Sequence, residues 1–371
     1  MKTLAVTLPD IIPLNKLKVW VLAPHLESDD PNLQCYYDFT QSLQEYTKVF
    51  NDLNIQWVWQ PVTMQNYKEV LASIKSQSEG KSPLVLNLCD GDEINGTPGI
   101  SVIHELENLG LIYTGSTASY YNITTSKIPM KEAFDAYNVS TPGWDVINDK
   151  DQSFEQLFDR LGSPLIIKPA ISGGSMGVSI NNVVHNEEEL KSQVDHLSNG
   201  YRGWELATGG LFVEQFIKGP EFTTFIVGSA SQPEKCIVYE PVERVFHSSL
   251  PETEKFLSFD RLWEIYEKES PMPNGDNFYQ YFPPDPKLVD AIKKISLDAY
   301  CAVGATGYGR LDIRMDATTG KLYMLEVNAQ CGLSEDEDYT SIGAILRVSG
   351  KTFTQLVLEI IRDAFIRRLY E

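Results

Sequence analysis

The chain has 371 residues, 42% of them hydrophobic and 11% aromatic, which exceeds one average domain and is ample for a sizeable core. Its formal charge of −20 at pH 7 argues against nucleic acid and against a membrane surface as partners, because both would be bound through Lys and Arg. The five cysteines are dispersed and never spaced as CxxC, which favours reduced thiols and no zinc site. The N-terminal stretch is too polar for a signal peptide and no run of 18 apolar residues occurs, so we expect a cytoplasmic protein.

Strand and helix patterns alternate over the first third of the chain. We expect strands at 17–23, 55–59, 83–88 and 111–114, and helices at 35–50, 67–75 and 100–108. This alternation predicts a parallel sheet with helices on its faces, and ligands of such sheets lie beyond the carboxyl ends of the strands. The loop Cys89–Pro98 leaves such an end and is a candidate site, although a solvated turn is equally compatible with its composition.

A glycine-rich loop follows a buried strand in the middle of the chain. The strand ends in Lys168, the loop spans Ile171–Gly177, and a second strand is expected from Val178. Glycines let backbone N–H groups close on an anion, and a Lys at the strand end supplies a compact charge for phosphate. The loop lacks the Walker pattern, and a flexible hairpin with a solvated Lys remains the alternative.

The next segments combine strands, a long polar stretch and two amphipathic helices. Residues 211–228 predict two strands broken at 218–220. Residues 241–284 are polar, rich in Pro and short of regular pattern, as functional lids or disordered segments are. The helices expected at 285–303 and 352–369 carry apolar stripes, so both are interpreted as structural.

Residues 309–332 predict a β-hairpin with strands Arg310–Met315 and Lys321–Val327, joined by the turn 316–320. Because strand side chains alternate between faces, its polar residues gather on one face while Leu and Ile occupy the other.

That polar face contains a candidate metal site. Arg310 and Asp312 share a face of the first strand, and Glu326 and Asn328 share a face at the end of the second. If the two faces coincide, the carboxylate and amide oxygens form a cluster that suits Mg²⁺, with a guanidinium beside it. A solvated hairpin face with scattered charges is the alternative.

The order of these features resembles the ATP-grasp ligases, specifically the D-alanine–D-alanine ligase branch. The motifs that carry the resemblance are GLIYTGS, PLIIKP, GPEFT, GRLD and LEVN with a following Gly, from about Pro83 to the C-terminus. The resemblance implies an α/β, three-domain ATP-grasp fold: an N-terminal parallel-sheet α/β domain, a small central α+β domain and a C-terminal α+β domain. These domains are expected at 1–122, 123–215 and 216–371, with a lid loop at about 241–284.

The resemblance also implies roles for individual residues. It places ATP at two lysines, the glycine-rich loop, a hinge that reads adenine through its backbone and an acidic residue on the ribose: Lys127, Lys168, Gly173, Gly174, Ser175, Glu214, Gln215, Phe216, Ile217 and Glu221. It implies metal ligands at Asp312, Glu326 and Asn328, and groups acting on the transferring phosphate at Arg310, Ser175 and Lys255. Substrate contacts are expected at Glu27, Gly332, Thr340 and Ser341.

The implied cofactors are ATP and Mg²⁺, with Mn²⁺ as a second option, and the implied partners are a small-molecule carboxylate and an amino acid. ATP converts a carboxylate into an acyl phosphate, which an amine then attacks to give an amide, ADP and phosphate. Dimers are common in the family, so a homodimer is an open expectation.

The substrate positions depart from the D-alanine enzyme. Cys89-Asp90-Gly91 replaces its His-Gly pair, and the acidic stretch Glu335–Asp338 lengthens the segment that holds its second substrate. We therefore expect an amino acid to be joined to another amino acid or to a small natural-product carboxylate, for example of the mycosporine type. A D-alanine–D-alanine ligase of cell-wall synthesis and a non-catalytic ATP-binding regulator are the alternatives.

Overall fold

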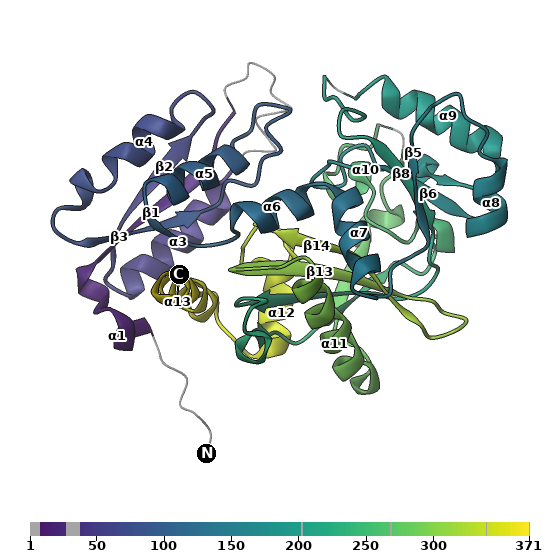
Figure 1. Ribbon diagram of the computed structural model, residues 1–371. Coiled ribbons are helices and arrows are strands. Elements are labelled where there is room, and N and C mark those ends of the chain that lie inside the picture. Colours follow the sequence, from purple (N-terminus) through teal and green to yellow (C-terminus); the bar gives the residue numbers. More distant parts are fainter. Residues whose placement is uncertain (1–7, 27–37, 202, 268, 339, 371) are drawn as a thin grey trace.

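The computed structural model describes residues 8–26, 38–201, 203–267, 269–338 and 340–370. Three sheets follow one another along the chain, and the N-terminal sheet and the central sheet stand on either side of the C-terminal one (Figure 1). The first sheet is parallel and the other two are antiparallel. This agrees with the expected fold, in which a parallel-sheet α/β domain precedes two α+β domains. None of the described helices is long and apolar enough to span a bilayer.

The N-terminal sheet has the strand order β2-β1-β3-β4. Its strands are β1 (Leu17–Pro24), β2 (Gln56–Val62), β3 (Ser82–Asn87) and β4 (Ile112–Tyr113), and its helices are α1 (Leu8–Ile11), α3 (Thr40–Asp52), α4 (Tyr67–Ser73) and α5 (Ile100–Asn108). Every residue of β1 is buried, because this apolar strand lies inside the sheet. The expected strands and helices are confirmed, except that α3 begins at Thr40 rather than Cys35, a position outside the described residues.

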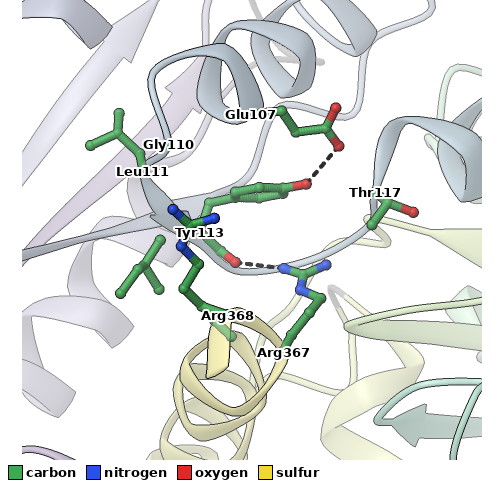
Figure 2. Close-up of a pocket in the computed structure, with 9 residues that line it drawn as sticks. Glu107, Gly110, Leu111, Tyr113, Thr117, Arg367 and Arg368 are labelled. Atoms are coloured by element: carbon green, nitrogen blue, oxygen red, sulfur yellow. Dashed lines mark hydrogen bonds between the residues drawn. The ribbon is translucent and has the colours of Figure 1, made fainter. Parts of the chain in front are cut away.

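The C-terminal helix α13 (Phe353–Tyr370) packs against this first sheet. Leu356 shares a hydrophobic core with Phe50 of α3. Near the end of the helix, Arg367 Nη2 donates a 2.7 Å hydrogen bond to the carbonyl of Tyr113 in β4, as Figure 2 shows. The C-terminal helix is thus anchored to the N-terminal sheet and its helices.

The central sheet has the order β5-β8-β6-β7. Its elements are β5 (Trp144–Ile147), α8 (Glu155–Leu161), β6 (Leu165–Pro169), β7 (Val183–Val184), α9 (Glu187–Ser198) and β8 (Leu211–Gln215). The strand expected from Val178 is wrong: a 3₁₀ turn over Ile180–Asn182 comes first, and β7 begins only at Val183. The buried Asn182 side chain stabilises that turn by donating to the carbonyls of Ile167 and Gly177 at 2.8 and 2.9 Å.

The C-terminal sheet has the order β12-β11-β9-β13-β14, with β10 paired to β9. Its strands are β9 (Glu221–Val227), β10 (Ile237–Val238), β11 (Val242–Phe246), β12 (Tyr279–Phe282), β13 (Tyr308–Met315) and β14 (Leu322–Ala329). The expected hairpin is confirmed as β13–β14. The helix α11 (Pro286–Ala302) packs Ile292 against Phe222 and Leu311 on one face, which leaves polar side chains on the other.

The expectation that 241–284 lacks regular structure is wrong in part. The segment supplies β11, the short helix α10 (Phe259–Leu262) and β12, and the two strands pair at the edge of the sheet. The alternation of apolar and polar residues is hard to see in β11, because the charged Arg244 occupies a buried position. Its partner there is Glu221 of another strand. The remaining helices are α6 (Ala118–Thr125), α7 (Lys127–Ala136) and α12 (Ser341–Ser349). The four described cysteines, Cys89, Cys236, Cys301 and Cys331, are unpaired, as expected.

Candidate active site

The β13–β14 hairpin brings the predicted oxygen cluster together. The register pairs Arg310 with Asn328 and Asp312 with Glu326. Asn328 Nδ2 donates to Asp312 Oδ2 and to Glu326 Oε1, both at 3.1 Å. Arg310 Nη2 donates to the same Asp312 Oδ2 at 3.0 Å. The three predicted metal ligands and the predicted catalytic arginine therefore occupy one small area.

This cluster fits a magnesium ion. Asp312 Oδ1 is buried and has no hydrogen-bond partner, which is unfavourable for a carboxylate oxygen unless a cation occupies the place beside it. Asn328 turns its amide nitrogen to the carboxylates, and a flip of that amide would present its oxygen instead. No three His, Cys, Asp or Glu side chains gather as a metal site in the described ranges, so this site has only two carboxylates. Such a set suits Mg²⁺ whose shell is completed by water and phosphate.

Lys127 connects this cluster to the glycine-rich loop. Its Nζ lies 3.9 Å from Glu326 Oε2 and donates to the carbonyl of Ser172 at 2.9 Å. Burial lowers the pKa of Lys127, while the Glu326 carboxylate opposes that shift. The amine thus lies between the Asp312–Glu326–Asn328 cluster and the glycine-rich loop, a position that suits a phosphate group.

Lys168 is part of a buried charge network. Its Nζ donates to Glu214 Oε1 at 2.6 Å, and Lys131 Nζ lies 2.7 Å from Glu214 Oε2. Burial by itself would raise the pKa of Glu214, but the two lysines lower it to about 2. One carboxylate therefore pairs with two ammonium groups. The three side chains together keep a net positive charge, which favours an anionic ligand.

The 241–284 segment packs onto the glycine-rich loop. Trp263 Nε1 donates to the carbonyl of Gly174 at 2.8 Å, and Ser175 Oγ donates to the carbonyl of Leu257 at 2.8 Å. Gly174 has φ +54°, and a Cβ there would lie 2.9 Å from the Trp263 ring. Gly173, by contrast, has open space around it. The loop is held in place from the side of the expected lid.

The predicted adenine hinge contains one backbone donor that is not engaged. The N–H groups of Gln215 and Phe216 bond to the carbonyls of Gly143 and Pro164 at 2.9 and 3.1 Å. Within the described chain the N–H of the buried Ile217 has no such acceptor, so it is the hinge donor left for a base.

Glu221, the predicted ribose ligand, lies between two arginines. The register sets Arg244 and Arg314 opposite it on the neighbouring strands. Arg244 Nη1 donates to Glu221 Oε1, and Arg314 Nη2 lies 3.1 Å from Oε2. Arg314 Nη1 also donates to the carbonyl of Ile217 at 3.1 Å. The network fixes the carboxylate and links it to the hinge, while its role toward ribose stays a prediction.

The remaining predicted residues that the structure describes form no hydrogen bond or ion pair with the Asp312–Glu326–Asn328 cluster or with the lysines beside it. Lys255 forms an ion pair with Glu252 in the expected lid. Thr340 caps α12 by accepting from the Ile342 N–H, and the neighbouring Ser341 Oγ is buried without a partner. A Cβ at the exposed Gly332 would lie 3.7 Å from Thr340. Glu27 lies outside the described residues.

The acidic stretch Glu335–Asp338 is partly neutralised by the protein itself. Glu335 lies 3.1 Å from Lys48 Nζ, and Glu337 pairs with Arg347. Two of its four acidic side chains are therefore paired with basic side chains of the protein.

Three residues that contact the predicted site residues are absent from the sequence-based set. Lys131 is one turn beyond Lys127 on α7, and Arg314 continues the Arg310–Asp312 alternation, so both could have been found by periodicity. Arg244 could not be found in this way, because residues 241–284 show no regular apolar pattern that predicts a strand.

Two carboxylates that fit a magnesium ion, beside buried lysines, suit a nucleotide-dependent ligase. Residues 136–362 match the family described as D-ala D-ala ligase C-terminus, and the chain belongs to that family. Its members are ADP-forming, Mg²⁺-using ligases that join a carboxylate to an amine with ATP, and this protein is such an enzyme.

Individual relatives agree with this assignment. D-alanine–D-alanine ligase B of Xanthomonas campestris is 28% identical over 75% of this chain and 77% of its own. The D-alanine–D-alanine ligase of Neisseria meningitidis serogroup B is 28% identical over 70% and 74%. The Bacillus anthracis D-alanine–D-alanine ligase structure superposes with a TM-score of 0.66, 19% identity and coverage of 95% of this chain and 99% of the other. The ATP complex of that enzyme gives a TM-score of 0.65 at 18% identity, covering 95% and 98%, so the expected ATP-grasp fold is confirmed.

Proposed function

We propose that this enzyme joins two amino acids through an acyl phosphate, and that D-alanine is the substrate to test first. The relatives named above act on D-alanine, which favours this alternative over the expected natural-product carboxylate. The observation that carries the proposal is the Asp312–Glu326–Asn328 cluster, which leaves one buried carboxylate oxygen without a partner and has Arg310 and Lys127 beside it.

The chemistry follows from where the charges lie. A substrate carboxylate oxygen forms a bond to the γ-phosphorus of ATP, and the bond from that phosphorus to the β-phosphate oxygen breaks, which releases ADP. Lys127 and Lys168 hold phosphate oxygens, and Arg310 stabilises the charge that develops on the transferred group. Mg²⁺ held by Asp312, Glu326 and Asn328 would neutralise phosphate charge, and Mn²⁺ is expected to replace it.

In the second half-reaction an amine attacks the acyl carbon. The C–N bond forms, the C–O bond to phosphate breaks, and the proton of the amine passes to the released phosphate or to solvent. Arg310, beside Asp312, would stabilise the charge on the departing phosphate as well as that on the transferred group.

A non-catalytic regulator is less well supported. Asn328 contacts Asp312 and Glu326, Lys127 lies 3.9 Å from Glu326, and Lys168 is held by Glu214, whereas a protein selected only for binding has no need of this set.

The test is ADP release from Mg-ATP with D-alanine, with L-alanine and with pooled D- and L-amino acids, each against a control without amino acid. Release that depends on D-alanine, with a dipeptide as product, is the expected result. Release with L-amino acids alone would contradict the D-alanine assignment but keep the ligase, and ATP binding without release in any pool would favour the regulator.

A further inference from the structure

Three neighbouring strands of the C-terminal sheet set polar side chains in one row. The register pairs Thr223 of β9 with Asp312 of β13, and it pairs Asp312 in turn with Glu326 of β14. Residues directly opposite each other in antiparallel strands share a face of the sheet, with their Cβ atoms about 5 Å apart. Thr223 is therefore the neighbour of the predicted metal ligand Asp312 on the side away from Glu326.

The Thr223 hydroxyl is buried without a use. The side chain is 1% exposed, and its Oγ1 makes no hydrogen bond to any residue that the structure describes. Its opposite residue on β11 is the buried Val242, which has no polar group to offer. Next on the same face of β9, the carboxylate of Glu221 is already engaged by Arg244 and Arg314. Because a buried hydroxyl without a partner is unfavourable, its presence here calls for an explanation.

Asp312 supplies the complementary unpartnered atom. Its Oδ2 accepts from Arg310 Nη2 at 3.0 Å and from Asn328 Nδ2 at 3.1 Å, whereas its buried Oδ1 has no partner in the described chain. An ionised carboxylate oxygen only accepts hydrogen bonds, and a hydroxyl can rotate to donate one. An unused donor and an unused acceptor thus occupy directly opposite positions of two paired strands.

The next row of the same face shows that side chains at these positions reach one another. Two residues away on each strand, Glu221 lies opposite Arg244 on β11 and opposite Arg314 on β13. Both arginines form ion pairs with its carboxylate. This row is fully engaged in the protein itself, whereas the pair of Thr223 and Asp312 is not.

We infer that Thr223 is a positioning residue for the cation, and that its hydroxyl donates to the Asp312 carboxylate when Asp312 and Asn328 hold Mg²⁺. Asn328 presents its amide oxygen to a cation only by turning Nδ2 away, so Asp312 then loses one of its present donors. Metal-binding carboxylates are held in orientation by hydrogen bonds from outside the ligand set, and Thr223 is placed to supply one. The inference rests on the cation site of the proposed function and deepens it, because Thr223 acts through Asp312 rather than on the reacting atoms.

The test measures Mn²⁺ binding from the electron paramagnetic resonance signal of the free ion, for the wild type and for Thr223→Val. ADP is present without an amino acid, so the readout does not depend on turnover, and a protein-free titration corrects for the Mn²⁺ that ADP itself binds. Valine keeps the shape of threonine and lacks the hydroxyl, so we expect the dissociation constant of Mn²⁺ to rise about 10-fold. Thr223→Ser keeps the hydroxyl and should bind Mn²⁺ nearly as the wild type does.

Thr224→Val is the matched control, because it makes the same substitution at the next residue, on the opposite face of β9. Thr224 is fully buried, and its Oγ1 donates to the carbonyl of Tyr239 at 2.9 Å. Losing that bond should lower the urea midpoint of unfolding while the Mn²⁺ affinity stays within about 2-fold of the wild type. Thr223→Val should show the reverse, because its hydroxyl has no hydrogen bond to lose in the metal-free protein.

Three results would overturn the inference: a wild-type Mn²⁺ affinity in Thr223→Val, an equal loss of affinity in Thr224→Val, or a loss in Thr223→Ser as large as that in Thr223→Val. A wild type that binds no Mn²⁺ in the presence of ADP would overturn it together with the cation site. If the wild type binds Mn²⁺ but releases no ADP with any amino acid, the proposed ligase function fails, and the comparison of Mn²⁺ affinities still decides the role of Thr223.

Discussion

Lys168 Nζ lies 2.6 Å from Glu214 Oε1, and the same carboxylate meets Lys131 on its other side, with the Glu214 side chain only 2% exposed. A single buried carboxylate thus orients two lysines. Lys168 is the one expected to contact phosphate, and Lys131 is buried away from any ligand. Removing the carboxylate leaves two ammonium groups without a counter-charge in the interior.

Glu214→Gln should therefore destabilise the fold by about 3 kcal/mol at neutral pH, because an uncompensated buried charge is costly. The folded-state pKa of Glu214, about 2, is below its ordinary value of 4.5, so the carboxylate stabilises the fold above pH 4.5 and loses that contribution as the pH falls toward 2. Urea unfolding of wild type and variant from pH 7 to pH 3 should give a difference that shrinks with acid. A difference independent of pH would contradict this account.

Glu326→Gln should abolish nearly all turnover, with a loss of about 100-fold or more, because it removes one of two carboxylates from the cation site. The side chain is 27% exposed, so folding should be little affected. Asp298→Asn, on the exposed pair with Lys294, is the charge-matched control. ADP-release rates over a Mg²⁺ titration measure both; a fully active Glu326→Gln protein would place the metal elsewhere.

Arg314→Met should weaken ATP binding and stability together. Arg314 is buried against Glu221 and donates to the hinge carbonyl of Ile217, so its loss leaves an acceptor unpaired and one carboxylate oxygen without its partner. We expect a cost of about 3 kcal/mol and a rise of roughly 10-fold in KM for ATP. Arg347→Met, at the half-exposed pair with Glu337, should cost about 1 kcal/mol or less. Equal effects of the two substitutions would rule out the buried network as the cause.

Gly174→Ala should loosen the glycine-rich loop. Its φ of +54° disfavours a side chain, and the new Cβ would meet the Trp263 ring at 2.9 Å. Gly173→Ala is the matched control, because nothing lies within 4 Å of its Cβ position. Hydrogen exchange of residues 171–177 should accelerate in the first variant and change little in the second. Similar exchange in both would mean that the contact with Trp263 does not hold the loop.

Arg367→Met should loosen the C-terminal helix from the first sheet. Its guanidinium donates to the carbonyl of Tyr113 (Figure 2) and to that of Gly115, and both carbonyls then lose this partner. A destabilisation of about 1 to 3 kcal/mol is expected from denaturant unfolding. Unchanged stability would show that apolar contacts alone anchor the helix.

The local pattern of the chain was sufficient for much of the fold and for the centre of the site. The period of two within each strand placed Arg310 with Asp312 and Glu326 with Asn328, while a register shift between Asp312 and Ile313 sets the two pairs opposite each other. The apolar stripe of α11 and the glycines after Lys168 were equally local signals. These features depend on neighbours a few residues apart, so the sequence by itself determined them.

Other features arise only when distant segments meet. Arg244 is tolerable in the interior because the β9–β11 pairing sets it opposite Glu221, 23 residues away. Lys131 is buried because β8 brings Glu214 to it, and the end of β14 meets the end of β3 through the hydrogen bond from Gln330 to the carbonyl of Asn87. A buried charge is stable only beside its partner, and the tertiary structure alone decides which partner that is.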